Sequence, residues 1–209
     1  MTTRMPDGLF LDGTLTLGDL SVQPGWGRST LNQEAAVAYP IPWEAWRIHD
    51  AYQTTLPGTA ATDDLALLGG VYGTSVPSLQ SSDAKTTTVT QYARCVMPLP
   101  VEYVNASAVS LMFHAGMKTT VSDGTATLDA QLFLSGKEGL VSGADLVTTA
   151  ATTINSLTMS DVSYSVTSGG LVSGDVLDIR ITVAITDAAG LTAVLGWIGA
   201  AYLKCGIKG

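Results

Sequence analysis

Strict alternation of apolar and polar positions marks two segments in the second half of the chain. In 125–134, TATLDAQLFL, every second residue from Ala126 to Leu134 is apolar. In 175–187, DVLDIRITVAITD, one face carries Leu177, Ile179, Ile181, Val183 and Ile185. A period of two is that of a β-strand, and a heptad pattern fits neither segment. Both segments are predicted strands with one face toward the core.

Turn signals separate further apolar runs. SDGT at 122–125 carries an Asp-Gly hairpin signal, and TSGG at 167–170 supplies glycines for positive φ. Short strands between polar turns are typical of a sandwich or jelly roll, so we predict an all-β fold, an antiparallel β-sandwich/jelly roll of about eight strands with an extended N-terminal arm. The strands are expected near 86–97, 105–115, 125–134, 145–149, 155–159, 162–167, 175–186 and 191–205.

The prolines divide the chain into two parts. All eight lie in the first hundred residues, and the last is Pro100. Because proline cannot donate in a central ladder, residues 81–209 are predicted to form the sandwich body and residues 1–80 an extended arm. In the arm, 8–20 has a weak strand alternation, and Pro42 suits the first turn of a short helix near 42–52.

The segment LTAVLGWIGAAYL at 191–203 is apolar on both faces. Simple alternation puts Trp197 and Ala201 on one face and Ile198 and Tyr202 on the other. Such a strand must be covered twice, by its own sandwich and by a neighbour. We therefore expect a homotrimer, with an interface that includes Leu195, Trp197 and Tyr202.

Composition and charge narrow the partners. Hydrophobic residues make up 46% of the chain and charged residues only 13%, which favours a surface partly covered by other proteins. The net charge of −8 repels phosphate, so no nucleic acid partner is expected. The start MTTRMPDGLF lacks the apolar region of a signal peptide, and no apolar run is long enough for a membrane helix, so no membrane partner is expected either.

The two cysteines, Cys95 and Cys205, do not form a CxxC motif. They are interpreted as reduced, buried thiols, with a disulfide as the alternative.

Candidate chemistry gathers in 42–70, which holds His49-Asp50 and Asp63-Asp64. A His-Asp pair occurs in metal-dependent phosphohydrolases, but two histidines in the whole chain are a poor metal set, so no metal or cofactor is predicted. Adjacent carboxylates diverge on a strand or helix, so Asp63 and Asp64 are not expected to form an acid-base pair. The lone His114 is expected to be packed or hydrogen-bonded.

Nucleophile and phosphate motifs are absent from the sequence as well. It contains no G-x-S-x-G elbow and no phosphate loop. No catalytic residue is predicted, and an enzyme is the least favoured class.

The aromatic and aliphatic residues of the arm suggest that it binds a partner. Aromatic anchors on an extended segment are typical of binding hot spots. They are expected to strap the protein to a partner, and the alternative is that they close the protein's own sandwich. The expected partner-binding residues are Trp26, Trp43, Trp46, Ile48, Tyr52, Leu65, Leu67 and Leu68.

Two runs carry a family resemblance, LPGTAATDDLALLGGVYGTSVPSLQSSDAKTTTVTQYARCVMPLPVEYV at 56–104 and INSLTMSDVSYSVTSGGLVSGDVLDIRITVAITD at 154–187. They resemble the head decoration, or cement, proteins of tailed bacteriophages. The resemblance implies a β-sandwich with an N-terminal arm, often trimeric, bound to the major capsid protein on the outside of the virion. It implies no catalytic residue and no cofactor. Synthesis in the host cytoplasm and a final place on the capsid surface are then expected.

Two other structural roles remain open. One is the receptor- or glycan-binding head of a phage tail fibre, which would need an exposed groove of aromatic and acidic residues. The other is a single-jelly-roll major capsid protein, which would assemble into shells by itself.

Overall fold

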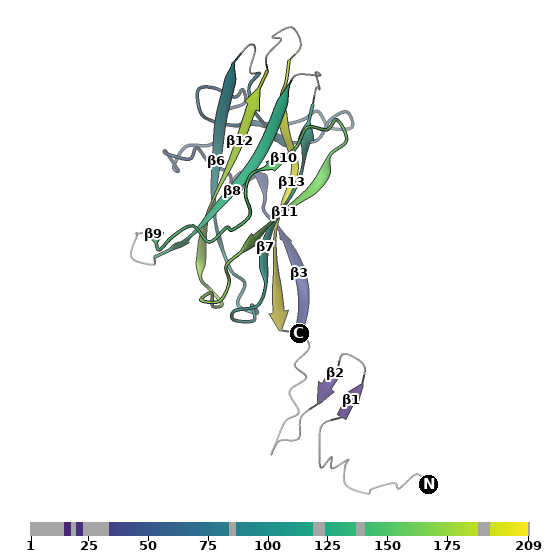
Figure 1. The fold of residues 1–209 in the computed structure, drawn as a ribbon, viewed down its shortest axis with the longest axis vertical. Coiled ribbons are helices and arrows are strands. Elements are labelled where there is room, and N and C mark those ends of the chain that lie inside the picture. Colours follow the sequence, from purple (N-terminus) through teal and green to yellow (C-terminus); the bar gives the residue numbers. More distant parts are fainter. Residues whose placement is uncertain are drawn as a thin grey trace, which may run out of the picture.

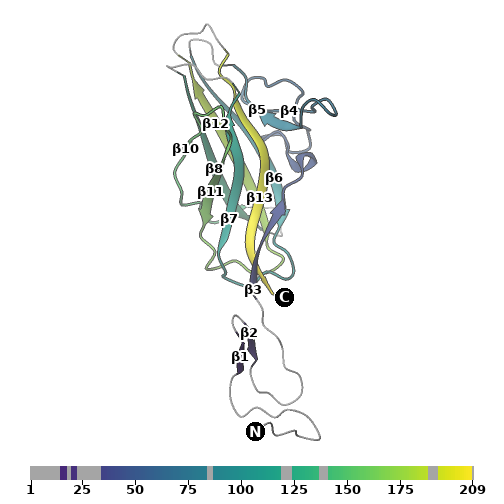
Figure 2. The ribbon, with the colours of Figure 1, turned by 90° about the vertical axis from the view of Figure 1, so that its right-hand side faces the viewer.

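Two antiparallel sheets packed face to face form the body of the protein, and Figure 2 shows β7 and β13 of one of them side by side. The computed structural model describes residues 15–17, 20–22, 34–83, 87–118, 124–136, 141–187 and 193–208. Successive long strands alternate between the sheets, so β6, β8 and β12 lie in one and β7, β11 and β13 in the other (Figure 1). The predicted antiparallel β-sandwich of the jelly-roll type is confirmed.

The five-stranded sheet has the order β10-β8-β12-β6, and β9 also pairs with β8. The central strand β12 pairs along its full length with β6 and β8. Its strands are β6 (Thr88–Pro98), β8 (Thr125–Ser135), β9 (Val141–Ser142), β10 (Thr152–Thr153) and β12 (Val176–Thr186).

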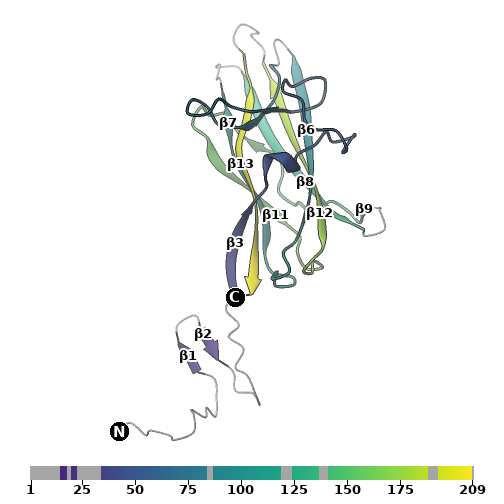
Figure 3. The same cartoon turned by 180° about the vertical axis from the view of Figure 1, so that it is seen from behind.

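The six-stranded sheet has the order β11-β7-β13-β5-β4, and β3 pairs with the far end of β13. Figure 3 shows β3 alongside the C-terminal end of β13. Its strands are β3 (Glu34–Pro40), β4 (Ala66–Leu68), β5 (Ser78–Gln80), β7 (Val109–Met117), β11 (Ser160–Val166) and β13 (Gly196–Lys208).

The core lies between the sheets and follows the predicted alternation. Leu177, Ile179 and Ile181 on β12 are fully buried and face the inner side chains of the other sheet. Tyr164 on β11 meets Phe113 edge-on and donates its hydroxyl to the backbone oxygen of Leu128 across the sandwich. Both cysteines are free and buried, which confirms the expected thiols.

The arm contains one described hairpin, in which β1 (Leu15–Leu17) pairs with β2 (Leu20–Val22). Of the weakly alternating segment 8–20, residues 15–17 and 20 lie in these two strands, and the rest lies outside the described residues. Trp26 lies outside the described residues.

The predicted boundary between arm and body at residue 80 is wrong. Strands β3, β4 and β5 all belong to the six-stranded sheet, so the body begins at residue 34. Prolines do not prevent this because Pro40 and Pro42 lie at and beyond the end of β3. Between β3 and β4, the chain crosses to the edge of β6 and returns.

The predicted helix over 42–52 is also wrong, because only a single 3-10 turn, η1 (Trp43–Ala45), forms there. The backbone groups that would continue a helix are used elsewhere. Arg47 donates its N–H to the carbonyl of Arg94 on β6 (2.8 Å) and accepts the N–H of Arg94 (3.0 Å). The segment therefore covers the open edge of β6, where an unpaired strand would otherwise be exposed.

Two predicted short strands are displaced. The strand expected over 145–149 gives way to β9 at 141–142, and the one over 155–159 to β10 at 152–153. Among the described residues, no helix is long and apolar enough to span a membrane.

Candidate functional site

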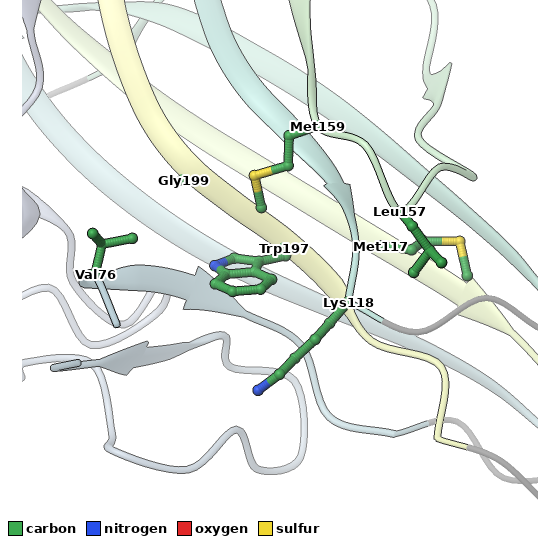
Figure 4. A pocket seen from close by; sticks show the side chains of 7 residues that line it. All are labelled: Val76, Met117, Lys118, Leu157, Met159, Trp197 and Gly199. Atoms are coloured by element: carbon green, nitrogen blue, oxygen red, sulfur yellow. The ribbon is translucent and has the colours of Figure 1, made fainter. Parts of the chain in front are cut away.

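An open apolar pocket of about 290 Å³ lies on the outer face of the six-stranded sheet. Figure 4 shows Trp197 at its centre, with Val76 on one side and Met159 on the other. Most of the lining is aliphatic, aromatic or thioether, and Lys118 supplies its charge. The lining residues are Val76, Met117, Lys118, Leu157, Met159, Trp197 and Gly199.

Two glycines on neighbouring strands allow Met159 to lie flat on the sheet. A Cβ on Gly116 would come within 3.2 Å of Met159 Cγ, and one on Gly199 within 3.2 Å of its Sδ. A Cβ on Gly116 would also lie 2.8 Å from the carbonyl oxygen of Ser156. The floor of the pocket therefore requires a missing side chain at both positions.

A β-bulge in β13 corrects the predicted face assignment. The register with β7 shifts between Ile198 and Ala200, so Gly199 is the extra residue. After this shift, Ala201 is buried in the core, whereas Tyr202 is outward-facing like Trp197. Trp197 and Tyr202 consequently share the outer face, which simple alternation did not predict.

Lys118 gives the pocket a positive rim. Its ammonium lies 5.4 Å from the centre of the Trp197 ring, within the range of a cation–π contact. Lys118 also donates its backbone N–H to the carbonyl of Leu195 (3.0 Å), which ties the end of β7 to the start of β13.

Exposed apolar side chains extend the pocket outward. Val76 is 65% and Leu157 61% exposed, and both line the pocket itself. Val71 and Tyr72, in the turn before Val76, are also exposed. Val76, Leu157 and Met159 are not among the site residues predicted from the sequence. The segment VYGTSVP could have indicated the pocket, because it is an apolar turn where polar residues are usual.

His49 forms a second cluster at the edge of β6. Its Nε2 lies 3.8 Å from Asp63 Oδ2, and its Nδ1 lies 3.6 Å from Asp64 Oδ1. The imidazole also packs on the Tyr92 ring, with 4.6 Å between the centres. His49 therefore contacts more than its neighbour in sequence, because the chain returns along β6 and brings Asp63 and Asp64 to the same ring.

The carboxyl of Asp64 has a raised pKa. Partial burial is the main cause, and the nearby charge of Asp63 adds to it, while His49 acts in the opposite direction. Burial and the charge of Asp63 therefore disfavour the charged form of Asp64.

Most of the expected partner-binding residues pack against the protein itself. Trp46 and Leu65 are 1% and 0% exposed and lie in the core, so the expectation that they contact a partner is wrong for this fold. Trp43, Ile48 and Leu67 are partly buried against the core, and Leu68 is half-buried. The Tyr52 hydroxyl accepts the N–H of Val96 (3.2 Å), and its ring packs under Arg94.

His114 behaves as expected. It lies opposite Asp161 in the pairing of β7 with β11, and its Nδ1 is 2.8 Å from Asp161 Oδ1.

Comparison with known proteins gives weak structural likenesses. No protein-family model matches the chain, and no curated protein matches it either. The CBM22-1 xylan-binding domain of Paenibacillus barcinonensis Xyn10C aligns with a TM-score of 0.39 and 8% identity over 85% of this chain and 97% of that domain. The CBM22-2 xylan-binding domain of the same protein gives 0.40 and 13% over 77% and 91%.

A third similar structure is a putative sugar binding protein from Bacteroides thetaiotaomicron. It has a TM-score of 0.37 and 12% identity, covering 69% of this chain and 82% of that one. Likenesses at this level add no argument about ligands, so the function must be argued from the residues of this chain.

Proposed function

We propose that this protein is a non-enzymatic virion structural protein that binds the outside of a phage capsid as a homotrimer and stabilises the shell. The observation that carries the proposal is the apolar pocket around Trp197 with the exposed Val76 and Leu157 beside it. An apolar patch of this kind on a protein with few charges is typical of a protein-protein interface. The resemblance to decoration proteins supplies the biological setting.

The chemistry of the pocket favours a protein as its occupant. An aliphatic or aromatic side chain fits the lining, and the Lys118 ammonium suits a carboxylate at the edge of the partner. A second copy offers carboxylates in excess, because the chain has 18 acidic residues against 10 basic ones. We assign the outer face of β13, with Leu195, Trp197 and Tyr202, to the trimer interface.

The capsid contact is assigned to residues that are not fully buried in the body. Trp43, Ile48, Tyr52, Leu67 and Leu68 are only partly buried; the first three lie on the segment that crosses to β6, and the two leucines lie on β4. In a trimer, each such contact is repeated on three subunits, which raises the overall affinity without strong single contacts.

Light scattering of the purified protein and of two matched valine variants tests the trimer. The wild type and V101S are expected to be trimers at micromolar concentration, since Val101 is 79% exposed but does not line the pocket. V76S, which changes a similarly exposed valine in the pocket, is expected to shift the protein toward the monomer. A monomeric wild type, or equal behaviour of V76S and V101S, contradicts the assignment.

Cosedimentation with expanded capsid shells that lack the protein tests the capsid partner. Saturable binding at a fixed number of copies per shell is expected. If the folded protein does not sediment with the shells, the proposal is contradicted.

A glycan-binding head of a tail fibre is the second candidate, favoured by the indole of Trp197 on an open sheet face, where a sugar ring can stack. Against it, the described residues of the lining include no carboxylate or amide side chain to bind hydroxyl groups. A glycan array separates the two, since glycan binding lost in W197A but retained in V101S favours this candidate. Closed shells formed by the protein alone, seen by electron microscopy, favour the single-jelly-roll major capsid protein instead.

A further inference from the structure

We propose that His49, Asp50 and Asp64 bind a divalent transition-metal ion of the zinc type, with Asp63 as a further carboxylate beside the ring. One ligand atom from each of the three residues lies within 4.8 Å of the others. This inference concerns the edge of β6 and does not depend on capsid binding.

Backbone hydrogen bonds to one strand hold the two ligand-bearing segments. On the first, Arg47 exchanges both backbone hydrogen bonds with Arg94, two residues before His49. On the second, the backbone carbonyl of Asp63 accepts the N–H of Tyr92 (2.8 Å), and the N–H of Leu65 donates to the Tyr92 carbonyl (3.0 Å). The ligand atoms are therefore carried by backbone fixed on both sides, as a preorganised site requires.

The two innermost atoms lack hydrogen-bond partners. His49 Nδ1 and Asp64 Oδ1 are both buried and face each other within ion-pair distance, but neither has a hydrogen-bond partner among the described residues. Buried polar atoms without partners are uncommon and need an explanation, such as an ion. Their separation of 3.6 Å is too long for a hydrogen bond. It is close to the roughly 3.4 Å expected between two ligands that each lie about 2.1 Å from one tetrahedral ion.

The donor set selects the ion. One imidazole nitrogen with carboxylate oxygens suits Zn²⁺ and its neighbours in the first transition row, whereas Ca²⁺ and Mg²⁺ prefer oxygen ligands alone. The local charge is also suitable, because three carboxylates surround His49. The guanidinium of Arg94, which donates to the backbone carbonyl oxygen of His49 (3.4 Å), is already paired with Asp178. Asp50 is exposed and gives the ion a route from solvent.

A bound ion would fasten the outgoing part of the crossing segment, with His49 and Asp50, to its returning part, with Asp64. The expected consequence is that binding stabilises the folded state, since an ion that binds only the native form shifts unfolding by mass action.

The test is titration calorimetry of chelator-treated protein with ZnCl₂, with thermal unfolding in ZnCl₂ and in MgCl₂. One Zn²⁺ per chain is expected, with a higher Tm in zinc than in magnesium. H114Q is the matched control, because it removes the other histidine of a His–Asp pair, and it should bind as the wild type does. Loss of a side chain that only supports a metal ligand lowers metal affinity about 10–100-fold. H49Q removes a ligand itself, so its zinc affinity should fall by more than that.

D50N keeps the result decisive if H49Q does not fold, because the Asp50 side chain is exposed. A folded D50N protein with at least tenfold weaker zinc binding supports the site. The proposal is overturned if the wild type binds no zinc, if H114Q abolishes binding, or if folded H49Q or D50N bind zinc like the wild type. In the first case, the contacts of His49 with its carboxylates serve the fold alone.

Discussion

Single side chains in the crossing segment have roles that their neighbours in sequence do not reveal. Trp46 is 1% exposed, and its indole Nε1 is buried without a hydrogen-bond partner among the described residues. Trp43, three positions earlier, is only partly buried. The tryptophan that looks like an exposed anchor in the sequence is therefore a core residue.

Trp46→Ala is expected to destabilise the fold by about 3–5 kcal/mol, because it leaves a cavity in the core. Trp43→Ala should cost clearly less. Chemical denaturation followed by tryptophan fluorescence and circular dichroism measures both. Equal, small losses for the two variants would mean that Trp46 does not belong to the core.

The residue types at the His49 cluster were visible in the sequence, but their proximity was not. The sequence predicts only that the adjacent carboxylates of Asp63 and Asp64 diverge from each other. They meet His49 on its two ring nitrogens because the chain turns and returns along β6, a path set by tertiary hydrogen bonds. No local pattern encodes such a return.

At the scale of elements, strands with one buried face were predictable and the others were not. The burial of β8 and β12 alternates as their sequences do, so their predicted ranges agree with the structure within one or two residues. Strand β3 has no buried residue in the described part of its EAAVAYP sequence, so no alternation marks it. Strands β4 and β5 have only three residues each, too few to show a period.

Removal of residues 1–33 is expected to leave the fold intact, whereas removal of residues 1–40 is not. The second deletion removes β3 and leaves Tyr202–Lys208 of β13 without a partner on that side. An open edge of this length promotes self-association. We expect the Tm to fall by roughly 5 °C or more only in the shorter protein.

Differential scanning fluorimetry and limited proteolysis of the two truncated proteins check this expectation. If both deletions leave the Tm unchanged, β3 does not contribute to the body. Rapid cleavage within 42–80 of the protein that lacks only residues 1–33 would show that this segment depends on other contacts than those described.

For the whole molecule, burial of tyrosines and thiols makes the fold sensitive to alkali. Burial raises the pKa of Tyr164 to about 12 from 10.0, and it raises the pKa of Tyr103 and of both cysteines. In each case the folded state holds its proton more tightly than the unfolded state. This contribution to stability is complete below about pH 9 and is lost as the pH rises toward 12.

Unfolding by urea at several pH values between 8 and 11.5 measures the loss. Tyr164→Phe is expected to be less stable at pH 8, because it lacks the hydrogen bond to Leu128, but its stability should fall less between pH 10 and 11.5. Parallel curves for the wild type and the variant would show that Tyr164 does not contribute to alkaline unfolding.

The place of β13 in its sheet also has a consequence for folding. It lies between β7 on one side and β3 and β5 on the other, yet it is the last described strand in the chain. During translation, its partners leave the ribosome first and cannot complete their ladders until it emerges. Non-local pairing of this kind is slow, because long loops must close before contacts form. Until β13 emerges, a nascent chain therefore exposes the edges of β3, β5 and β7 that β13 later covers, and this is the interval in which misassociation with neighbouring chains is expected.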